Sequence, residues 1–509
     1  MKRIAVILAS LFLALGCREK EAVPQSYPPA IRVELTYFDA FKIKFTVSTI
    51  GASSVLYGVG VTENEAMALA KEATTPSTLA EKLELSWNGL LPLTEYILCV
   101  KGVGPGGETD RWESIPFKTA NGPDGLYDWE RERNGAPSFA DISLVTLGRH
   151  NSNPPEWTPE RFGSHVAFDG KWLFDAFLLI DGWDPARNLS YSITPNRYSA
   201  TQESWQDLLD AWLGPDGAIL KLEEAVARAE KAIGPPPSKR YVVMGVPDPI
   251  MFQYFGDKNS STTYWGSIDG RELDFRAVSD QIAAYQWYID RCRYMFDALD
   301  VPHLELAGFY TLSEELHLSE SFYKGLGISY SSADTWNAQY KRWEEILPAV
   351  SSYLHSCNEG LWWVPYCLAP GYKVWDALGF DMAFMQPNHY WDTSNQHPMS
   401  KTIQAMKQYG MGIELEFEYS MVADVMKDGR MGPDGSGNMI FTAADIPALR
   451  SRLREYMDSY KDAGLYGRFP IAVYSGTDAW NQLATSSDSN DKEMFREICN
   501  FITQSPLRQ

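Results

Sequence analysis

Short apolar runs alternate with longer helical segments from about residue 138 to the end of the chain. Eight of these runs have the length of buried strands, and they lie at residues 141–147, 173–180, 240–246, 304–311, 361–367, 381–385, 412–418 and 470–474. Strands that alternate with helices are typical of parallel βα units. Eight such units predict an α/β fold, a (β/α)8 TIM-like barrel, although Ile328-Ser329-Tyr330 could be a ninth strand.

The segments between these runs carry helical patterns, at residues 204–233, 275–299, 337–355, 401–409 and 443–463. The last segment follows Thr442, whose hydroxyl can cap a helix N-terminus, and ends near Gly464, a residue type that favours helix C-termini. We expect these helices to form the outer layer of the barrel.

A different pattern fills residues 30–120, where short runs alternate apolar and polar side chains between turns. This period-two alternation predicts a small all-β sandwich. Within it, Leu90-Leu91-Pro92-Leu93-Thr94-Glu95-Tyr96 resembles the fibronectin type III pattern, in which the tyrosine hydroxyl bonds back to the chain. The resemblance implies an immunoglobulin-like module that acts as a spacer, with sugar binding as the less favoured alternative.

The N-terminal residues carry the features of an export signal. Lys2 and Arg3 precede an apolar run that ends at Leu15, and Gly16 lies directly before Cys17. This arrangement resembles a bacterial lipoprotein signal peptide, and the run is shorter than the roughly 20 apolar residues that span a bilayer. We therefore expect a cell-envelope lipoprotein at the outer membrane, on its surface or periplasmic face, that is anchored only through lipidated Cys17.

These patterns divide the chain into five parts. Residues 1–17 are the expected signal peptide with its lipidated cysteine, 18–29 a flexible tether, 30–120 the sandwich, 121–137 a linker and 138–509 the barrel, which is the candidate catalytic domain. The 45% hydrophobic content supports a large folded core. The net charge of −21 argues against nucleic acid and anionic membrane surfaces as partners, and we expect a monomer.

Several chemistries lack their sequence motifs. The chain has no P-loop, no Gly-x-Gly-x-x-Gly after a strand and no Gly-x-Ser-x-Gly elbow, so we expect no cofactor. The histidine and cysteine spacings predict no metal site, and residues 432–438 lack the alternating acids of a calcium-binding EF-hand loop. Beyond Cys17, two alternatives remain for the cysteines: a Cys357–Cys367 disulfide, or five free thiols.

Polar and aromatic side chains follow the ends of the predicted strands, where barrel enzymes carry their chemistry. They are His150, Asp181, Trp183, Asp184, Asp248, Gln386, Asn388, His389, Tyr390, Trp391 and Asp478. Sugar hydroxyls require hydrogen-bonding partners, and the apolar face of a sugar ring stacks on aromatic side chains. Although most of the 17 tryptophans are expected in the core, this clustering predicts a carbohydrate-binding surface.

Two acidic clusters lie on this same edge. Glu314 and Glu315 follow the fourth predicted strand, while Glu414, Glu416 and Glu418 alternate along the seventh and so share one face of it. The residues between the three glutamates are apolar and belong against helices, which turns the glutamates toward the barrel interior. Because buried carboxylates are costly, this row points to chemistry. We predict Glu314 as general acid/base and Glu416 as nucleophile or second carboxylate, with Glu315, Glu418 and Glu414 as alternates.

An acid/base after strand four and a nucleophile at the end of strand seven resemble a large clan of glycoside hydrolases, although Ser313 stands where that clan has asparagine before the acid. Residues 127–501 also resemble an uncharacterised domain family in lipoproteins of glycan-degrading Gram-negative bacteria. Its landmarks are Gly-Phe-Tyr before the acidic pair and Gly-x-Glu-x-Glu-Phe-Glu. The first resemblance implies hydrolysis of a poly- or oligosaccharide, whereas the second implies fold and setting without an activity.

Two alternatives to an enzyme remain: a non-catalytic surface protein that binds glycans on a hydrolase-like barrel, and a structural or adhesive surface protein. The separation of the carboxyls distinguishes them. About 5–5.5 Å indicates a retaining hydrolase and about 6.5–9.5 Å an inverting one, whereas a larger gap or a plugged barrel mouth favours binding alone.

Overall fold

The computed structural model describes residues 28–38, 42–75, 82–91, 94–119, 139–148, 156–194, 196–434, 438–476 and 478–508. The chain forms two compact units, of which the first contains Ile43–Trp87 and Thr94–Thr119 and the second contains Ala120–Gln509. Cys17, most of the expected tether, the expected linker and His150 lie outside the described residues. Within those described ranges, no helix combines the length and apolar character that a membrane crossing needs.

The first unit is a β-sandwich. One sheet contains β1 (Ala30–Phe38), β2 (Lys42–Ile50) and β5 (Leu83–Asn88), and the other contains β3 (Ser54–Gly60), β4 (Lys71–Thr74), β6 (Glu95–Gly104), β7 (Gly107–Glu108) and β8 (Glu113–Lys118), with the short helix α2 (Glu63–Ala68). Exposed and partly buried residues alternate along β1, as its period-two pattern predicts. The rings of Phe45 and Tyr57, one from each sheet, meet edge-on at 5.6 Å.

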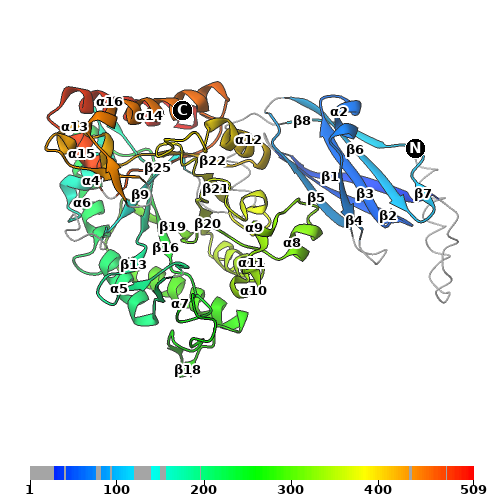
Figure 1. Cartoon of the computed structure of the whole chain (residues 1–509), viewed down its shortest axis with the longest axis horizontal. Helices are drawn as coiled ribbons and strands as arrows, with labels where there is room; N and C mark the ends of the chain where they lie inside the picture. Colours follow the sequence, from blue (N-terminus) through cyan, green and yellow to red (C-terminus); the bar gives the residue numbers. More distant parts are fainter. Residues whose placement is uncertain are drawn as a thin grey trace. The chain divides into compact units, whose positions relative to one another are not determined.

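The second unit is a closed eight-stranded barrel in which every recorded neighbour pair is parallel (Figure 1). Its strands, in chain order, are β9 (Asp141–Thr146), β12 (Ala176–Ile180), β16 (Arg240–Val246), β19 (Leu304–Thr311), β20 (Gly360–Trp363), β21 (Met382–Met385), β22 (Gly412–Glu416) and β25 (Ile471–Tyr474). Each predicted strand segment overlaps one of these strands. The predicted fold class is therefore confirmed, and Ile328-Ser329-Tyr330 is not a strand.

Helices surround the ring of strands (Figure 1). The principal ones are α4 (Pro159–Val166), α5 (Gln202–Leu213), α6 (Ala218–Ile233), α7 (Val278–Asp297), α11 (Trp343–His355), α12 (Met399–Tyr409), α14 (Ile446–Asp462) and α16 (Ser489–Thr503). Shorter helices are α8 (Glu320–Gly325), α9 (Ser332–Thr335), α10 (Ala338–Lys341), α13 (Ala423–Met426), α15 (Ala479–Thr485), η1 (Tyr372–Val374), η2 (Tyr419–Met421), η3 (Ala443–Asp445) and η4 (Pro506–Arg508).

Two predicted helices are interrupted. Residues 204–233 form α5 and α6, which are separated by a turn that ends at Gly217, where a Cβ atom would lie 2.4 Å from the Trp212 carbonyl oxygen. Residues 337–355 are broken at Arg342, whose φ of 53° is left-handed and ends α10 before α11 begins. Thr442 forms the expected N-terminal cap, since its side chain and Asp445 make a reciprocal capping box ahead of α14.

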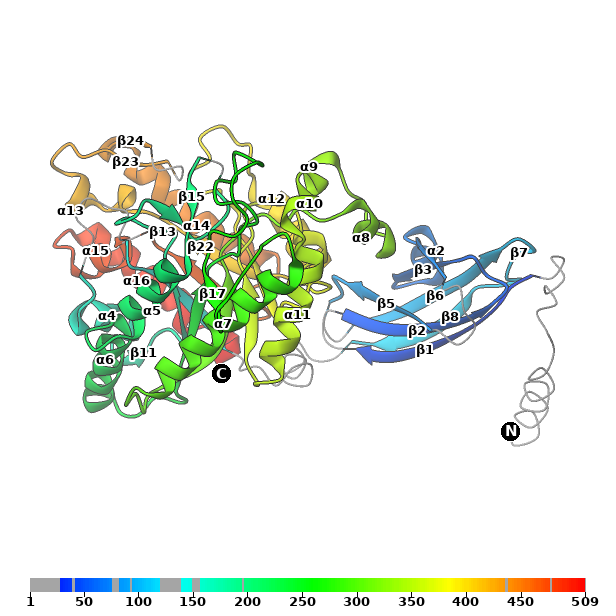
Figure 2. The same cartoon turned by 90° about the horizontal axis from the view of Figure 1, so that it is seen from below.

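Short strand pairs extend the loops at the end of the barrel where the strands terminate. They are β13 (Trp183–Asp184), β14 (Leu189–Ser190) and β15 (Tyr198–Ser199), together with β23 (Gly432–Pro433) and β24 (Met439–Phe441). Figure 2 shows β13, β15, β23 and β24 at the upper end of the barrel and the C-terminus at its lower end. Elsewhere lie the pairs β10 (Ala167–Phe168) with β11 (Lys171–Trp172), and β17 (Ser267–Ile268) with β18 (Arg271–Glu272).

The cysteines after Cys17 are all free thiols, so the Cys357–Cys367 disulfide alternative is wrong. Cys99, Cys292 and Cys499 are buried.

A buried ion network joins the C-terminus to the starts of the barrel strands. Arg508 donates from Nε and Nη2 to the two carboxylate oxygens of Asp141, at 2.5 and 2.6 Å. Asp141 also accepts the backbone N–H of Asp175, whose carboxylate pairs with Arg240 at 3.0 Å. Burial raises the pKa of Asp141 to about 6, although Arg508 favours the ionised form. This network satisfies charges from three strands at the lower end of the barrel.

Replacing Arg508 should destabilise the protein strongly. Arg508→Met leaves the fully buried Asp141 carboxylate without its cation, which costs about 3–5 kcal/mol of unfolding free energy. Denaturant unfolding at pH 8 measures the loss, and adding Asp141→Asn should recover part of it. As a control, Arg228→Met removes two exposed ion pairs, with Glu160 and Glu224, and should change the stability little. Equal, small losses in both variants would contradict a structural role for the network.

Candidate active site at the barrel mouth

The predicted acids lie on one barrel strand and directly after another. Glu314 follows the end of β19 at Thr311, and β22 carries Glu414 and Glu416, which have at most 1% of their surface exposed. The charges of Glu314, Glu414 and Glu416 repel one another enough to raise carboxyl pKa values in this group. The fold thus brings together three acids that are about a hundred residues apart in the sequence.

One carboxyl oxygen of Glu416 accepts two hydrogen bonds. Its Oε2 accepts hydrogen bonds from the Tyr456 hydroxyl on α14 and from the Asn388 backbone N–H at 2.8 Å. Its Oε1 is buried without a hydrogen-bond partner in the described part of the chain. Complete burial raises the pKa of Glu416 to about 8, and the hydrogen bonds from Tyr456, Asn388 and the Gln386 side chain offset only part of this effect. In this arrangement the Glu416 carboxyl is therefore neutral near pH 7.

Glu414 lacks such donors. Its Oε2 is also buried and unpartnered in the described residues, and the Tyr460 hydroxyl bonds only to its backbone carbonyl, at 2.7 Å. Burial, followed by repulsion from Glu416 and Glu314, raises the pKa of Glu414 well above its ordinary value. Burial and repulsion thus both disfavour the ionised form of Glu414.

Glu314 opens onto a pocket of about 380 Å³. The pocket is lined by Ser192, Ile193, Leu312, Ser313, Glu314, Glu315, Lys341 and Tyr366. The Glu314 side chain reaches solvent in this pocket, but protein surrounds the carboxyl on its other sides. Desolvation by that surrounding protein, together with repulsion from Glu315, raises the pKa of Glu314 to about 7. A carboxyl of this kind can both donate and accept a proton at neutral pH.

Asp248 supports this pocket from below. It follows β16, is 3% exposed, and accepts hydrogen bonds from Ser313 Oγ at 2.5 Å and from the Tyr285 hydroxyl at 3.1 Å. Burial raises the pKa of Asp248 to about 7. Because both of its oxygens are occupied by neighbouring side chains, Asp248 positions Ser313 and the loop that carries Glu314.

The remaining acids at the mouth are held by other partners. Glu315 bonds to His317 Nε2 at 3.2 Å, and this contact lowers the pKa of Glu315. Glu418 accepts a hydrogen bond from the Tyr474 hydroxyl at 3.1 Å. The Glu418 carboxylate also lies against Gly476, where a Cβ atom would approach its Oε2 to 1.9 Å. A side chain at position 476 would therefore displace Glu418.

Four predicted substrate contacts after strands two and eight are held within the protein. Asp184 accepts from the backbone and guanidinium of Arg187, and Asp478 pairs with Arg161 at 2.7 Å. The Trp183 ring lies 3.1 Å beneath the Arg197 guanidinium, and Asp181 is 2% exposed. His150 lies outside the described residues.

The segment after β21 is largely buried. His389 bonds to the His397 carbonyl and to Glu455, each at 3.0 Å, and Tyr390 is fully buried against Ser420. Gln386 is partly exposed, and its side chain hydrogen-bonds to Glu416. Trp391 is only 9% exposed and lies beside Tyr390 and Tyr474. Most of this predicted surface therefore packs inside the barrel loops.

Asn388 has a different position from its neighbours. Its φ of 57° is left-handed, so its backbone N–H turns toward Glu416 while its side-chain amide donates to the Tyr366 hydroxyl at 2.9 Å. Tyr366 also lines the pocket beside Glu314, and both Glu314 and Glu416 raise the pKa of its phenol. Asn388 and Tyr366 thus form a hydrogen-bonded link between the buried Glu416 and the pocket that Glu314 lines.

Sequence reasoning missed the residues that support these acids, chiefly Lys341, Tyr366 and Tyr456. Tyr456 belongs to the buried face of α14, which includes Leu449, Leu453 and Tyr460 at helical spacing. That periodicity indicates burial but not a partner for the hydroxyl. Lys341 carries no motif at all. Among the described residues, no group of three or more His, Cys, Asp or Glu side chains is arranged to hold a metal ion.

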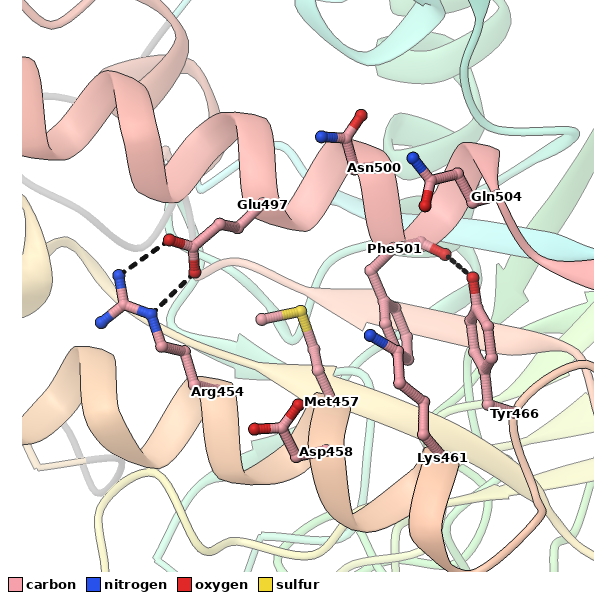
Figure 3. Close-up of a pocket in the computed structure, with 9 residues that line it drawn as sticks. All are labelled: Arg454, Met457, Asp458, Lys461, Tyr466, Glu497, Asn500, Phe501 and Gln504. Atoms are coloured by element: carbon pink, nitrogen blue, oxygen red, sulfur yellow. Dashed lines mark hydrogen bonds and ion pairs between the residues drawn. The ribbon is translucent and has the colours of Figure 1, made fainter.

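A second pocket lies away from the barrel mouth, between α14 and α16 (Figure 3). Its volume is about 360 Å³, and it is lined by Arg454, Met457, Asp458, Lys461, Tyr466, Glu497, Asn500, Phe501 and Gln504. Arg454 and Glu497 form a paired contact at 2.7 and 2.9 Å across it, as Figure 3 shows. It contains none of the predicted site residues, so it is not the candidate active site.

The raised carboxyl pKa values predict how stability responds to pH. Asp248, Glu314 and Glu416 bind protons more tightly in the folded chain than in the unfolded chain, where carboxyl pKa values are about 4. Folding therefore takes up protons between about pH 4 and 8, and the free energy of unfolding should rise as the pH falls through this window. Urea unfolding at several pH values measures the slope.

Glu416→Gln should flatten that slope, because the variant has one fewer buried titrating carboxyl. Glu305→Gln changes an exposed side chain of β19 and serves as the matched control, with a slope equal to that of the wild type. A stability that falls steadily on acidification from pH 8 to 5 would contradict the described burial of these acids.

Comparison with known proteins adds little beyond the fold. No curated protein matches the chain. A cyclomaltodextrinase structure is 12% identical, with 94% of this chain and 85% of that chain covered and a TM-score of 0.35. A Bifidobacterium dentium β-glucuronidase complexed with coumarin-3-O-glucuronide is 10% identical over 88% of this chain and 60% of that chain, with a TM-score of 0.29. A redesigned β-sandwich protein is 18% identical over 19% of this chain and 96% of that chain, with a TM-score of 0.14.

Likenesses this weak carry no functional argument, so the comparison rests on the family match. The match covers residues 141–431, which run from the first barrel strand to the loop after the seventh and make up more than half of the chain. The chain therefore belongs to the family described as a domain of unknown function, DUF4855.

Proposed function

We propose that the barrel hydrolyses glycosidic bonds in a poly- or oligosaccharide. The observation that carries this proposal is that one acid in the pocket lies close to two buried acids. Glu314 lines the pocket, and its charge contributes to the raised pKa values of Glu414 and Glu416. Glycosidases use two carboxyls, one that donates a proton to the leaving oxygen and one that acts as nucleophile or activates water. The fold supports this assignment by setting the acids at the strand ends, where barrel enzymes carry their chemistry.

Glu314 suits the general acid/base. Its pKa of about 7 lets it donate a proton to the glycosidic oxygen and later accept one from water. Ser313 and Asp248 hold the loop that presents it, through the short hydrogen bond between them. A carboxyl with a pKa near 4 would already have lost its proton at neutral pH.

Glu416 suits the second carboxyl because donors are in place for its ionised form, namely Tyr456, the Asn388 N–H and the Gln386 side chain. Burial keeps it neutral in the present arrangement, so its negative charge requires that water or substrate reach it. Exposure would remove the main cause of its raised pKa and leave the Tyr456 bond in place. The carboxylate could then attack the anomeric carbon directly or activate a water molecule.

The burial of Glu416 also favours a second candidate function, in which the barrel binds glycan without cleaving it. Glu416 has no exposed surface and does not line the pocket. A sugar in the pocket would then contact Glu314, Glu315, Lys341 and Tyr366 but would not reach a nucleophile. The two candidates differ in whether the pocket deepens toward Glu416 when a glycan binds.

Variants of the two acids distinguish these functions. Glu314→Gln and Glu416→Gln should each lower turnover at least ~100-fold and leave glycan affinity nearly unchanged, because each removes a proton-transfer or nucleophilic step. Turnover is measured as reducing ends released from a panel of polysaccharides, and affinity by calorimetry. Glu305→Gln is the surface control.

The same assay tests the alternates, with Glu315→Gln and Glu418→Gln. A loss confined to one of these variants would move the role to that residue. Wild-type turnover in both the Glu314 and Glu416 variants would refute the acid pair. Binding without any cleavage by the wild-type protein would favour the second candidate function.

We also propose that the chain is an envelope lipoprotein anchored through Cys17, on the pattern of Lys2, Arg3 and the apolar run before Gly16. Cys17→Ser should shift the protein from the membrane fraction to the soluble fraction of a bacterial host, because the lipid is its only expected anchor. Cys357→Ser, which alters a different thiol, should leave the distribution unchanged. Retention of the Cys17 variant in the membrane fraction would rule out lipid anchoring at this residue.

A further inference from the structure

Lys341 is a buried cation in the wall of the candidate active-site pocket. It is the last residue of α10, it is 8% exposed, and it lines the same pocket as Glu314, Glu315 and Tyr366. Arg342, which follows it, is left-handed and turns the chain into α11. The lysine is thus fixed at the mouth by the break between two helices.

The ammonium group of Lys341 makes no hydrogen bond and no ion pair with the described residues. The two acids whose charges act on Lys341 are Glu315 and Asp248. Both have other hydrogen-bond partners. Glu315 bonds to His317, and Asp248 accepts hydrogen bonds from Ser313 and Tyr285. Burial lowers the pKa of Lys341 to about 8, so the group remains mostly charged at neutral pH. A buried charge without a partner is costly unless something compensates it.

Two internal roles for Lys341 do not account for its position. It does not set the protonation of Glu314, since burial and Glu315 are what raise the Glu314 pKa. It is not a cation held for aromatic packing either, because its Nζ lies 5.7 Å from the nearest recorded ring, Phe255, whereas Lys258 lies 3.2 Å from that ring and donates to the Phe255 carbonyl. Three donors of Lys341 therefore remain for a ligand in the pocket.

Lys341 is the one cation among the lining residues of the pocket, which also include Glu314 and Glu315, and Lys258 lies close enough to act on it. The charge of Lys258 acts on Lys341 and helps to lower its pKa. A neutral sugar would leave the Lys341 ammonium without a charged partner, whereas an anionic substituent placed on it would be attracted by it. The unpaired ammonium, rather than the net charge of the pocket, thus favours a ligand that carries a negative group.

We propose that Lys341 binds an anionic substituent of the sugar in this pocket, a carboxylate of a uronic acid or a sulfate ester. This inference rests on the proposed glycan function and names its substrate class. The sugar ring would lie beside Tyr366 with its anionic group on Lys341 and its glycosidic oxygen near Glu314. Charge-assisted hydrogen bonds from an ammonium supply affinity that a hydroxyl in the same place does not.

Binding to matched glycans tests the proposal. The probes are polygalacturonate, glucuronoxylan and chondroitin sulfate fragments, each also as its carboxyl-reduced form, and the last also desulfated. The full chain should bind an acidic glycan about 10–100-fold more tightly than its neutral counterpart, which is the effect of a hydrogen bond to a charged group. The arm that loses affinity, carboxyl-reduced or desulfated, identifies the anionic group.

Lys341→Met should remove this preference and leave affinity for the neutral form unchanged, whereas Lys341→Arg should keep most of it. Lys231→Met removes an exposed charge on α6 and is the control. As a measurement that needs no variant, wild-type affinity for the acidic glycan should fall between about 0.05 and 0.5 M salt more steeply than affinity for the neutral form.

Equal affinity for acidic and neutral forms, or a Lys341→Met loss of the same size on both, overturns the inference while the proposed glycan function stands. A folded wild-type protein that binds none of the glycans overturns both.

Discussion

The closed barrel depends on the ion network at its lower end. Asp141 begins β9, the strand that completes the ring by pairing with β25 on one side and β12 on the other. Arg508, from the last turn of the chain, supplies the cation that this buried carboxylate needs. Asp175 and Arg240 extend the same network to the starts of β12 and β16. The first and last parts of the barrel are thus joined through one satisfied set of charges.

The carboxyl groups at the two ends of the barrel differ in whether they have partners. At the lower end, Asp141 and Asp175 each have an arginine, so their charges are compensated. At the mouth, Glu414 and Glu416 have buried oxygens without partners in the described residues, and repulsion among the acids raises pKa values. A stable fold without a function at this end would gain by replacing those glutamates with apolar residues. This difference in hydrogen bonding and charge pairing supports placing the proposed function at the mouth.

The sequence predicted the barrel well because periodicity and strand composition carry it. All eight strand segments were located. Glu314 was placed after the fourth strand and Glu416 on the seventh, where the fixed side-chain alternation of a strand puts Glu414 and Glu416 on one face. The breaks at Gly217 and Arg342 were missed because they depend on local backbone geometry that helical periodicity does not reveal. The partners of the acids, such as Tyr456 and Lys341, were missed for a further reason: they meet the acids only through tertiary packing, which no spacing along the chain encodes.

The predicted aromatic surface shows where sequence position alone misleads. Tyr390 and Trp391 follow a barrel strand, as sugar platforms often do, yet both are buried and pack around Tyr474 and Ser420. They instead fix the loop that carries Asn388, which reaches Glu416 with its backbone and Tyr366 with its side chain. Any movement that opens the pocket toward Glu416 must therefore alter the Asn388–Tyr366 contact. The Asn388–Tyr366 hydrogen bond therefore connects access to Glu416 with the shape of the pocket that Glu314 lines.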